Sequence, residues 1–149
     1  MEPLSLGEDF DAVAASLSPT VRALPLDPVK VSAGFPSPAA DYEGRRLDVN
    51  EYLIRNPVST FFFMVEGDSM EGAQIFDGDV LVVDRSVPAA HGSVVVAFVD
   101  GERLVKRLWT RDGRCALVAE NPAYPPLEIR EGSELVVWGV AVGKFRRLP

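Results

Sequence analysis

The sequence predicts a mainly β protein whose strands are largely antiparallel, arranged as a β-sandwich or a partly closed barrel behind an irregular N-terminal arm. From residue 60 onward, short apolar runs alternate with turn-forming dipeptides. No long helical pattern separates these runs, which disfavours a parallel sheet with crossover helices. In the first forty residues, by contrast, prolines interrupt every candidate element.

The N-terminal stretch contains few elements that can be predicted. Prolines stand at positions 19, 25, 28, 36 and 38, where each fixes φ and removes a backbone donor. Residues 8–17 have the pattern of one short amphipathic helix. Residues 34–46 are predicted to be an extended, flexible arm.

The β-rich part begins with a short helix. Asp48 and Glu51 have the spacing of a capping box, and we expect the helix to run through Ile54 because Pro57 prevents its continuation. Six strands are expected after it, over residues 61–66, 80–84, 94–99, 103–109, 115–119 and 135–142. Turn sequences separate them at Asp77-Gly78-Asp79, Asp100-Gly101 and Asp112-Gly113. The last two are typical of two-residue hairpins.

Composition limits the classes of function. The chain has 149 residues, enough for one domain with a tail, and its 47% apolar and 25% charged residues are ordinary for a soluble globular protein. Its net charge of −7 disfavours a sequence-independent grip on DNA phosphates. We therefore expect any role near DNA to be indirect, through a partner.

The single cysteine and the single histidine are predicted to be structural. Cys115 has no partner for an intrachain disulfide, which suits a reducing cytosol. Its apolar neighbours indicate a buried strand thiol, and His91 lies in a turn between two apolar runs. These two residues cannot assemble a zinc site, and we expect neither a metal nor another cofactor.

The sequence also predicts a cytoplasmic location without membrane contact. The N-terminus lacks the basic start and apolar stretch of a signal peptide. No uncharged apolar run approaches the roughly 20 residues that a membrane-spanning helix needs.

Two positions carry the candidate chemistry, a serine in a turn and a lysine in an apolar strand. Gly67-Asp68-Ser69-Met70 closes one predicted strand, and Lys106 lies inside a later one. A serine beside a desolvated lysine can cut a peptide bond, because the neutral amine serves as the base that activates the hydroxyl. Glycine-flanked serines in turns are common in structural roles, so neither position is diagnostic alone.

Strand alternation places Lys106 on an apolar face. Leu104, Lys106 and Leu108 share that face because successive side chains of a strand point to opposite sides. Lys106 is its only charged residue. The ammonium group must reach water along its flexible stem, enter a buried ion pair, or lose its proton. The strand pattern leaves these three alternatives open.

A proline-stiffened segment offers a substrate within the same chain. Residues 31–38 read Val-Ser-Ala-Gly-Phe-Pro-Ser-Pro, with the small residues Ala33 and Gly34 in the middle. An extended peptide can add to the edge of a sheet, and small side chains allow a nucleophile to approach closely. The alternative is an ordinary flexible linker.

Taken together, these motifs resemble the LexA/UmuD family of self-cleaving proteins. The resemblance rests on the order of Ala33-Gly34, Gly67-Asp68-Ser69-Met70 and Val105-Lys106-Arg107. Further similarity is found in residues 34–42, 77–79, 82–84, 91–92 and 99–102, so that it covers residues 33 to 149.

The resemblance implies a role for each matching residue. Ser69 would be the nucleophile and Lys106 the general base of a serine endopeptidase that cuts its own Ala33–Gly34 bond. Residues 1–33 would be the segment removed, 34–46 the flexible arm and 47–149 the β-rich peptidase and dimerisation domain. The 33 residues before Gly34 are too few for the DNA-binding domain of the repressors in this family.

The resemblance also implies regulation and partners. The filament of RecA on single-stranded DNA would stimulate the cleavage during the SOS response. The shortened homodimer would then serve a UmuC-like translesion polymerase in SOS mutagenesis.

Three alternatives remain open at this point. The first is a signal-peptidase-like protease that is not anchored in a membrane. The second is a non-enzymatic β module that binds a polymerase or another partner, in which Ser69 is an ordinary turn residue. The third is a fragment of a phage-type repressor.

Overall fold

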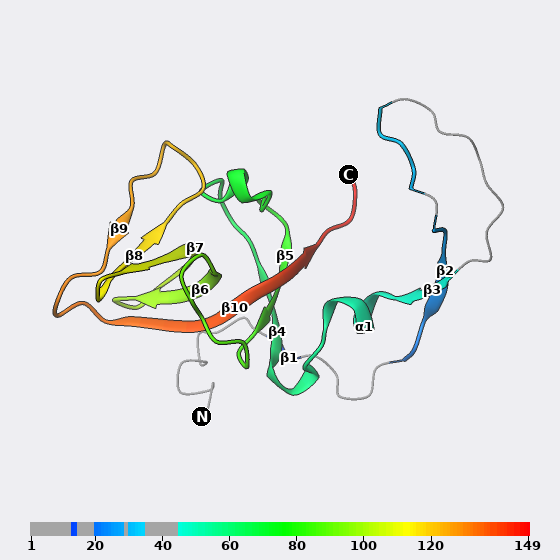
Figure 1. The fold of residues 1–149 in the computed structure, drawn as a ribbon, viewed down its shortest axis with the longest axis horizontal. Coiled ribbons are helices and arrows are strands. Elements are labelled where there is room, and N and C mark those ends of the chain that lie inside the picture. The colour runs from blue at the N-terminus through cyan, green and yellow to red at the C-terminus, as the bar shows by residue number, and fades with distance from the viewer. Residues whose placement is uncertain (1–12, 15–19, 29, 35–44) are drawn as a thin grey trace. The chain divides into compact units, whose positions relative to one another are not determined.

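The computed structural model describes residues 13–14, 20–28, 30–34 and 45–149, and antiparallel strands dominate them (Figure 1). These residues form two compact units. One contains residues 13–14 and 56–149, and the other contains the described residues from 20 to 55. The mainly β, antiparallel fold predicted from the sequence is confirmed. None of the described helices has the length and apolar composition needed to span a membrane.

The smaller unit contains a two-stranded ladder that the sequence analysis did not predict. Strand β2 (Ala23–Leu26) pairs antiparallel with β3 (Arg45–Asp48). Pro25 lies opposite Arg46 in this ladder. A proline is tolerated here because each strand of a two-stranded ladder has a free edge, where no donor is needed.

Helix α1 (Val49–Leu53) follows β3 directly. The Asp48 side chain caps it by accepting hydrogen bonds from the N–H groups of Asn50 at 2.9 Å and Glu51 at 3.2 Å. The same carboxylate accepts a 2.7 Å hydrogen bond from the N–H of Arg22. Led by the bond from Arg22, these hydrogen bonds hold the pKa of Asp48 below its usual value. The predicted short helix is confirmed, with Ile54 as its C-cap.

The larger unit is built on one eight-stranded sheet. Its strands are β1 (Val13–Ala14), β4 (Thr60–Met64), β5 (Val80–Asp84), β6 (Val94–Val99), β7 (Glu102–Arg111), β8 (Arg114–Val118), β9 (Leu127–Glu128) and β10 (Leu135–Phe145). They pair antiparallel in the order β1-β4-β5-β10-β6-β7-β8-β9. Figure 1 shows the long β10 running between β5 and β6. Since β1 and β9 form the two edges, the described strands do not close into a barrel.

The predicted strands and hairpins are present in this sheet. Strands β5 and β6 have the predicted bounds, and the other four predicted strands differ at their ends by three residues or fewer. At both hairpins, Asp and Gly have positive φ: 48° and 84° at Asp100 and Gly101, and 49° and 74° at Asp112 and Gly113. Two successive positive φ angles define the type I′ turn, whose twist matches that of the flanking strands.

The predicted N-terminal helix differs from the structure where the two can be compared. Of residues 8–17, only Val13 and Ala14 are described, and they form β1, paired with Phe62 and Phe61 of β4. In this pairing the two residues form backbone hydrogen bonds with the edge of β4, which a helix over residues 8–17 would leave without these partners. The tertiary pairing therefore outweighs the local helical propensity of the segment. The rest of that helix, and residues 35–44 of the predicted arm, lie outside the described residues.

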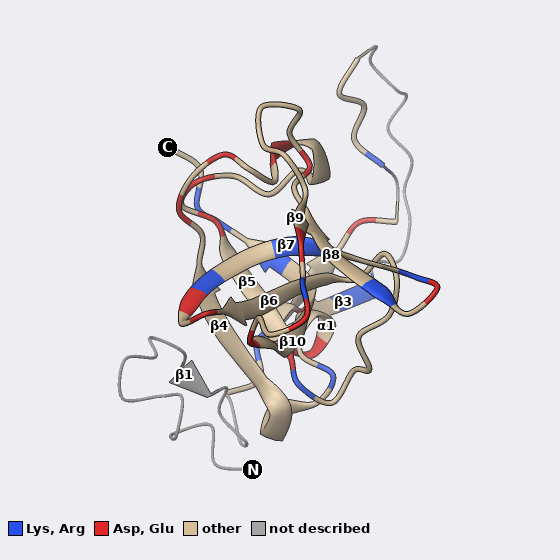
Figure 2. Cartoon of the chain, turned by 90° about the vertical axis from the view of Figure 1, so that its left-hand side faces the viewer, with Lys and Arg blue, Asp and Glu red and all other residues tan. Residues whose placement is uncertain are grey.

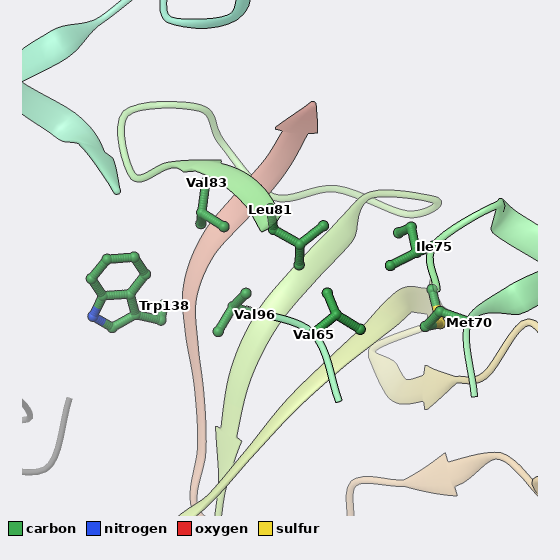
Figure 3. Packing of buried hydrophobic residues seen from close by; sticks show 7 residues of the cluster. All are labelled: Val65, Met70, Ile75, Leu81, Val83, Val96 and Trp138. Atoms are coloured by element: carbon green, nitrogen blue, oxygen red, sulfur yellow. The ribbon is translucent and has the colours of Figure 1, made fainter. Parts of the chain in front are cut away.

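Both faces of the sheet are packed against buried side chains. The first cluster comprises Val65, Met70, Ile75, Leu81, Val83, Val96 and Trp138 (Figure 3). The second comprises Val95, Ala97, Val99, Leu108, Leu117 and Val140. Alternate residues of β6 enter different clusters, as the two-residue period of a strand requires. Strand β6 therefore runs through the centre of the core.

Candidate active site

Ser69 lies in the turn between β4 and the 3₁₀ helix η3 (Glu71–Ala73). Gly67 opens the turn with a φ of 93°, a backbone conformation that favours glycine, and its N–H donates to Asp77 Oδ1 at 2.8 Å. Met70 is only 1% exposed and packs into the first cluster (Figure 3). A buried side chain directly after the serine anchors the turn, and Ser69 itself is half-buried.

Lys106 reaches the serine from β7. Its Nζ lies 2.5 Å from Ser69 Oγ, within hydrogen-bonding distance, although the two residues are 37 positions apart. Leu108 belongs to the second buried cluster and the partly buried Leu104 packs against it, as the alternation predicted. Arginines stand near the lysine along the same strand (Figure 2), yet Lys106 is the basic residue that meets the serine. The structure thus brings the two predicted residues together.

The environment of Lys106 favours the neutral amine. Burial lowers the pKa of Lys106 below its ordinary value, because desolvation penalises the charged form. Within the described residues, no carboxylate forms an ion pair with this ammonium group. The centroid of the Tyr124 ring lies 5.8 Å from Nζ. At the 2.5 Å that separates Lys106 Nζ from Ser69 Oγ, an amine and a hydroxyl can exchange a proton directly.

A groove of about 720 Å³ contains both side chains. It is lined by residues 62–66, which form the end of β4 and the start of the following turn, by residues 103–106 of β7, and by residues of β5 and β6. Among the described residues, strand β1 pairs with Phe61 and Phe62 of β4. The groove mixes apolar side chains with the charges of Glu66 and Arg103. These features suit an extended peptide that lies beside a strand.

The two residues of the predicted cleavage site lie in the smaller unit. Ala33 and Gly34 form a bend and both are exposed. The N–H of Gly34 donates to Ser32 Oγ at 3.2 Å, so the bend is closed by a local hydrogen bond. The structure describes these residues within their own unit, and the cleavage site remains a prediction.

Cys115 and His91 have structural surroundings. Cys115 lies half-buried on β8, and burial raises the pKa of its thiol, which disfavours the reactive thiolate. His91 Nδ1 accepts a 3.1 Å hydrogen bond from the N–H of Thr110, and its ring lies edge-on to Trp109. Both contacts fix a loop to the end of β7, as expected for a loop histidine.

Sequence reasoning missed the residues that support the serine from the far side of the site. Asn121 and Tyr124, which lie between β8 and β9, form hydrogen bonds with Asp68 in the serine turn. They lie 53 and 56 positions from Asp68. The only local signal was an Asn-Pro and a Pro-Pro dipeptide flanking an aromatic residue, which indicates a turn and nothing more.

Comparison with known proteins places the chain among peptidases. Residues 25–142 match the family described as Peptidase S24-like. Protein MucA of Salmonella typhimurium is 46% identical over 131 residues, which are 87% of this chain and 89% of MucA. Protein SamA of the same organism is 44% identical over 128 residues, or 86% of this chain and 89% of SamA. The LexA repressor of Bordetella pertussis is 36% identical over 120 residues, which are 80% of this chain and 55% of the repressor.

Proposed function

This chain belongs to the Peptidase S24-like family, and on that basis we propose that it is a UmuD-like, self-cleaving serine–lysine peptidase of the SOS response. Its substrate is its own Ala33–Gly34 bond, its nucleophile is Ser69 and its general base is Lys106. One observation carries the proposal: the Lys106 amine lies 2.5 Å from the Ser69 hydroxyl, at a site whose burial favours the neutral amine.

The reaction begins with proton transfer. Neutral Lys106 accepts the proton of the Ser69 hydroxyl while Oγ attacks the carbonyl carbon of Ala33. As the tetrahedral intermediate collapses, the bond to the Gly34 nitrogen breaks. The lysine ammonium donates its proton to this leaving amine and becomes neutral again. Water, activated by the same lysine, then hydrolyses the ester between Ser69 and Ala33.

The turn itself supplies groups that can stabilise the oxyanion. Within the described residues, the backbone N–H groups of Ser69 and Met70 have no hydrogen-bond acceptor. Preorganised donors at such a position stabilise the charge that develops on the carbonyl oxygen in the transition state. Since Ala33 and Gly34 are small, they allow the scissile carbonyl to approach these donors closely.

The substrate segment must change conformation before it can react. The bend at Ala33 and Gly34 is closed by the hydrogen bond to Ser32, whereas binding beside a strand requires an extended backbone. We propose that opening this bend is part of the shift towards a docked minor state. The RecA filament on single-stranded DNA would stimulate cleavage by stabilising that state.

The product is proposed to be a cytoplasmic homodimer of residues 34–149 that acts as an accessory subunit of a UmuC-like translesion polymerase. Residues 34–149 hold 13 basic and 17 acidic residues, and this net charge of −4 supports an indirect role at DNA through such a partner. A binding assay between the shortened chain and the polymerase tests this role. The uncut Ser69→Ala chain serves as the matched control, because this role requires cleavage.

Self-cleavage is tested by incubating the purified chain at increasing pH. We expect a new N-terminus at Gly34, identified by mass spectrometry, at a rate that rises with pH because the neutral lysine is the active form. Cleavage should disappear in both Ser69→Ala and Lys106→Ala. Cleavage that persists unchanged in either variant would refute the assignment of the dyad.

A further inference from the structure

The segment of residues 120–124, which follows β8, contacts both the turn that carries Ser69 and the strand that carries Lys106. We refer to it as the 120–124 segment. The amide of Asn121 donates to the carbonyl oxygen of Asp68 at 3.0 Å, and the hydroxyl of Tyr124 donates to the carboxylate of Asp68 at 2.5 Å. The carbonyl oxygen of Glu120 accepts the N–H of Gly72 at 2.7 Å.

These contacts hold the serine turn on both sides of Ser69. Asp68 directly precedes the nucleophile, and Gly72 follows it by three residues. The approach at Gly72 is so close that a Cβ there would lie 2.6 Å from the Glu120 carbonyl oxygen. The backbone around Ser69 is therefore fixed from the 120–124 segment at two points.

The same segment also holds the strand that carries the base. The Glu120 carboxylate accepts a hydrogen bond from Arg107 Nε at 2.5 Å, and Arg107 is the residue after Lys106. The other end of this guanidinium group donates to the carbonyl oxygen of Gly92 at 2.7 Å. The ring of Tyr124 faces the Lys106 ammonium group, with the centroid 5.8 Å away. One segment thus sets the position of the serine relative to the lysine.

We propose that Asn121 is a positioning residue for self-cleavage, which holds the Asp68 carbonyl and thereby fixes the turn that presents the Ser69 hydroxyl to Lys106. Its side chain forms two hydrogen bonds of different purpose. The Oδ1 atom accepts the N–H of Ala123 at 3.0 Å, which shapes the segment itself. The Nδ2 group donates to Asp68 and connects the segment to the nucleophile. This inference rests on the proposed function.

The substitution Asn121→Asp separates these two purposes. A carboxylate keeps the acceptor for the Ala123 N–H but has no hydrogen to donate to the Asp68 carbonyl. A lost hydrogen bond of ordinary net strength corresponds to as much as about tenfold in rate. A displaced reactive group can cost about a hundredfold. We therefore expect self-cleavage at 25 °C to slow by about 10- to 100-fold.

The dependence of the rate on pH distinguishes positioning from a loss of basicity. The loss in Asn121→Asp should be the same at every pH from 7 to 10, with an unchanged midpoint, because Lys106 stays buried. Asn121→Ser provides a second, uncharged test, since its hydroxyl can accept from Ala123 but is too short to reach Asp68. Glu128→Gln is the control, because it breaks only the exposed ion pair with Arg114 and should cleave at the wild-type rate.

The proposal is supported if both Asn121 variants remain folded at 25 °C and cleave at least tenfold more slowly with the wild-type midpoint. It is overturned if a folded variant cleaves within twofold of the wild-type rate, or if the midpoint moves. It is equally overturned if both variants are unfolded at 25 °C, since Asn121 would then be a folding residue. A wild-type chain that never cuts at Ala33–Gly34 would instead refute the proposed function, and the positioning role with it.

Discussion

Replacing Gly72 by alanine tests how tightly the serine turn is held. A Cβ at this position would lie 2.6 Å from the Glu120 carbonyl oxygen, the atom that accepts the Gly72 N–H at 2.7 Å. Carbon–oxygen contacts of this kind are usually about 3.3 Å or longer. The two backbones must therefore separate by about 0.7 Å, which breaks the hydrogen bond and moves the turn that carries Ser69.

Both stability and activity should respond to Gly72→Ala. Overpacking costs about 1–3 kcal/mol and the lost hydrogen bond about 0.5–1.5 kcal/mol. We expect the free energy of unfolding to fall by about 2–3 kcal/mol, which corresponds to a decrease in Tm of about 5–10 °C. A shift approaching 1 Å at the nucleophile should slow self-cleavage at 25 °C by up to about a hundredfold. Calorimetry and the appearance of the Gly34 N-terminus measure the two effects.

Gly139→Ala is the matched control for this substitution. A Cβ there would lie 2.7 Å from Val83 Cγ1, a clash of similar severity on the sheet and away from the serine turn. We expect a similar decrease in Tm, with self-cleavage at 25 °C within about threefold of wild type. Normal cleavage by a destabilised Gly72→Ala variant, or an equal loss of cleavage in the two variants, would contradict a role of this contact in holding Ser69.

Three further predictions concern buried groups. The fully buried Asp79 lies 2.9 Å from Lys144 Nζ and 2.6 Å from Arg146 Nε, so Asp79→Asn should lower the free energy of unfolding, measured in urea, by about 2–3 kcal/mol. Burial raises the pKa of Asp79 and of Asp84, but hydrogen bonds, joined at Asp79 by the two cations, outweigh it and hold both pKa values below normal. The stability that these carboxylates contribute is therefore present above their unfolded pKa of about 4 and is lost as the pH falls below that value. A urea midpoint that rises on acidification from pH 5 to 3 would contradict this prediction. Met70→Ala, next to the serine, should cost about 2–5 kcal/mol in the same urea assay, and a loss under 1 kcal/mol would show that Met70 does not anchor the turn.

The sheet could be predicted where its signals are local. Strands β5 and β6 are short runs rich in valine and bounded by turn residues, and their bounds followed from that pattern. Strand β10 continues to Phe145, beyond the predicted end at residue 142, because it pairs with β5 there. Strands β1, β2, β3 and β9 were missed because they are short and their stability comes from pairing with other segments and not from their own propensities.

The two residues of the proposed dyad could also be predicted from local signals, whereas the residues that support them could not. Ser69 and Lys106 stand out locally, one in a glycine-containing turn and the other as a single charge on an apolar strand face. Asn121 and Tyr124 show no such contrast, since their role depends on contacts across more than fifty residues. Asp68 likewise acquires its partners only when the chain folds.

The most direct test of the account is a titration of Lys106 itself. The chain has three lysines, Lys30, Lys106 and Lys144, so NMR of isotope-labelled lysine can resolve each amine in the uncleavable Ser69→Ala chain. We expect Lys106 to lose its proton below the ordinary lysine pKa of about 10.4, because burial lowers the pKa of its amine. A Lys106 that titrates at or above the ordinary lysine pKa of about 10.4 would contradict the claim that burial prepares it to act as the base.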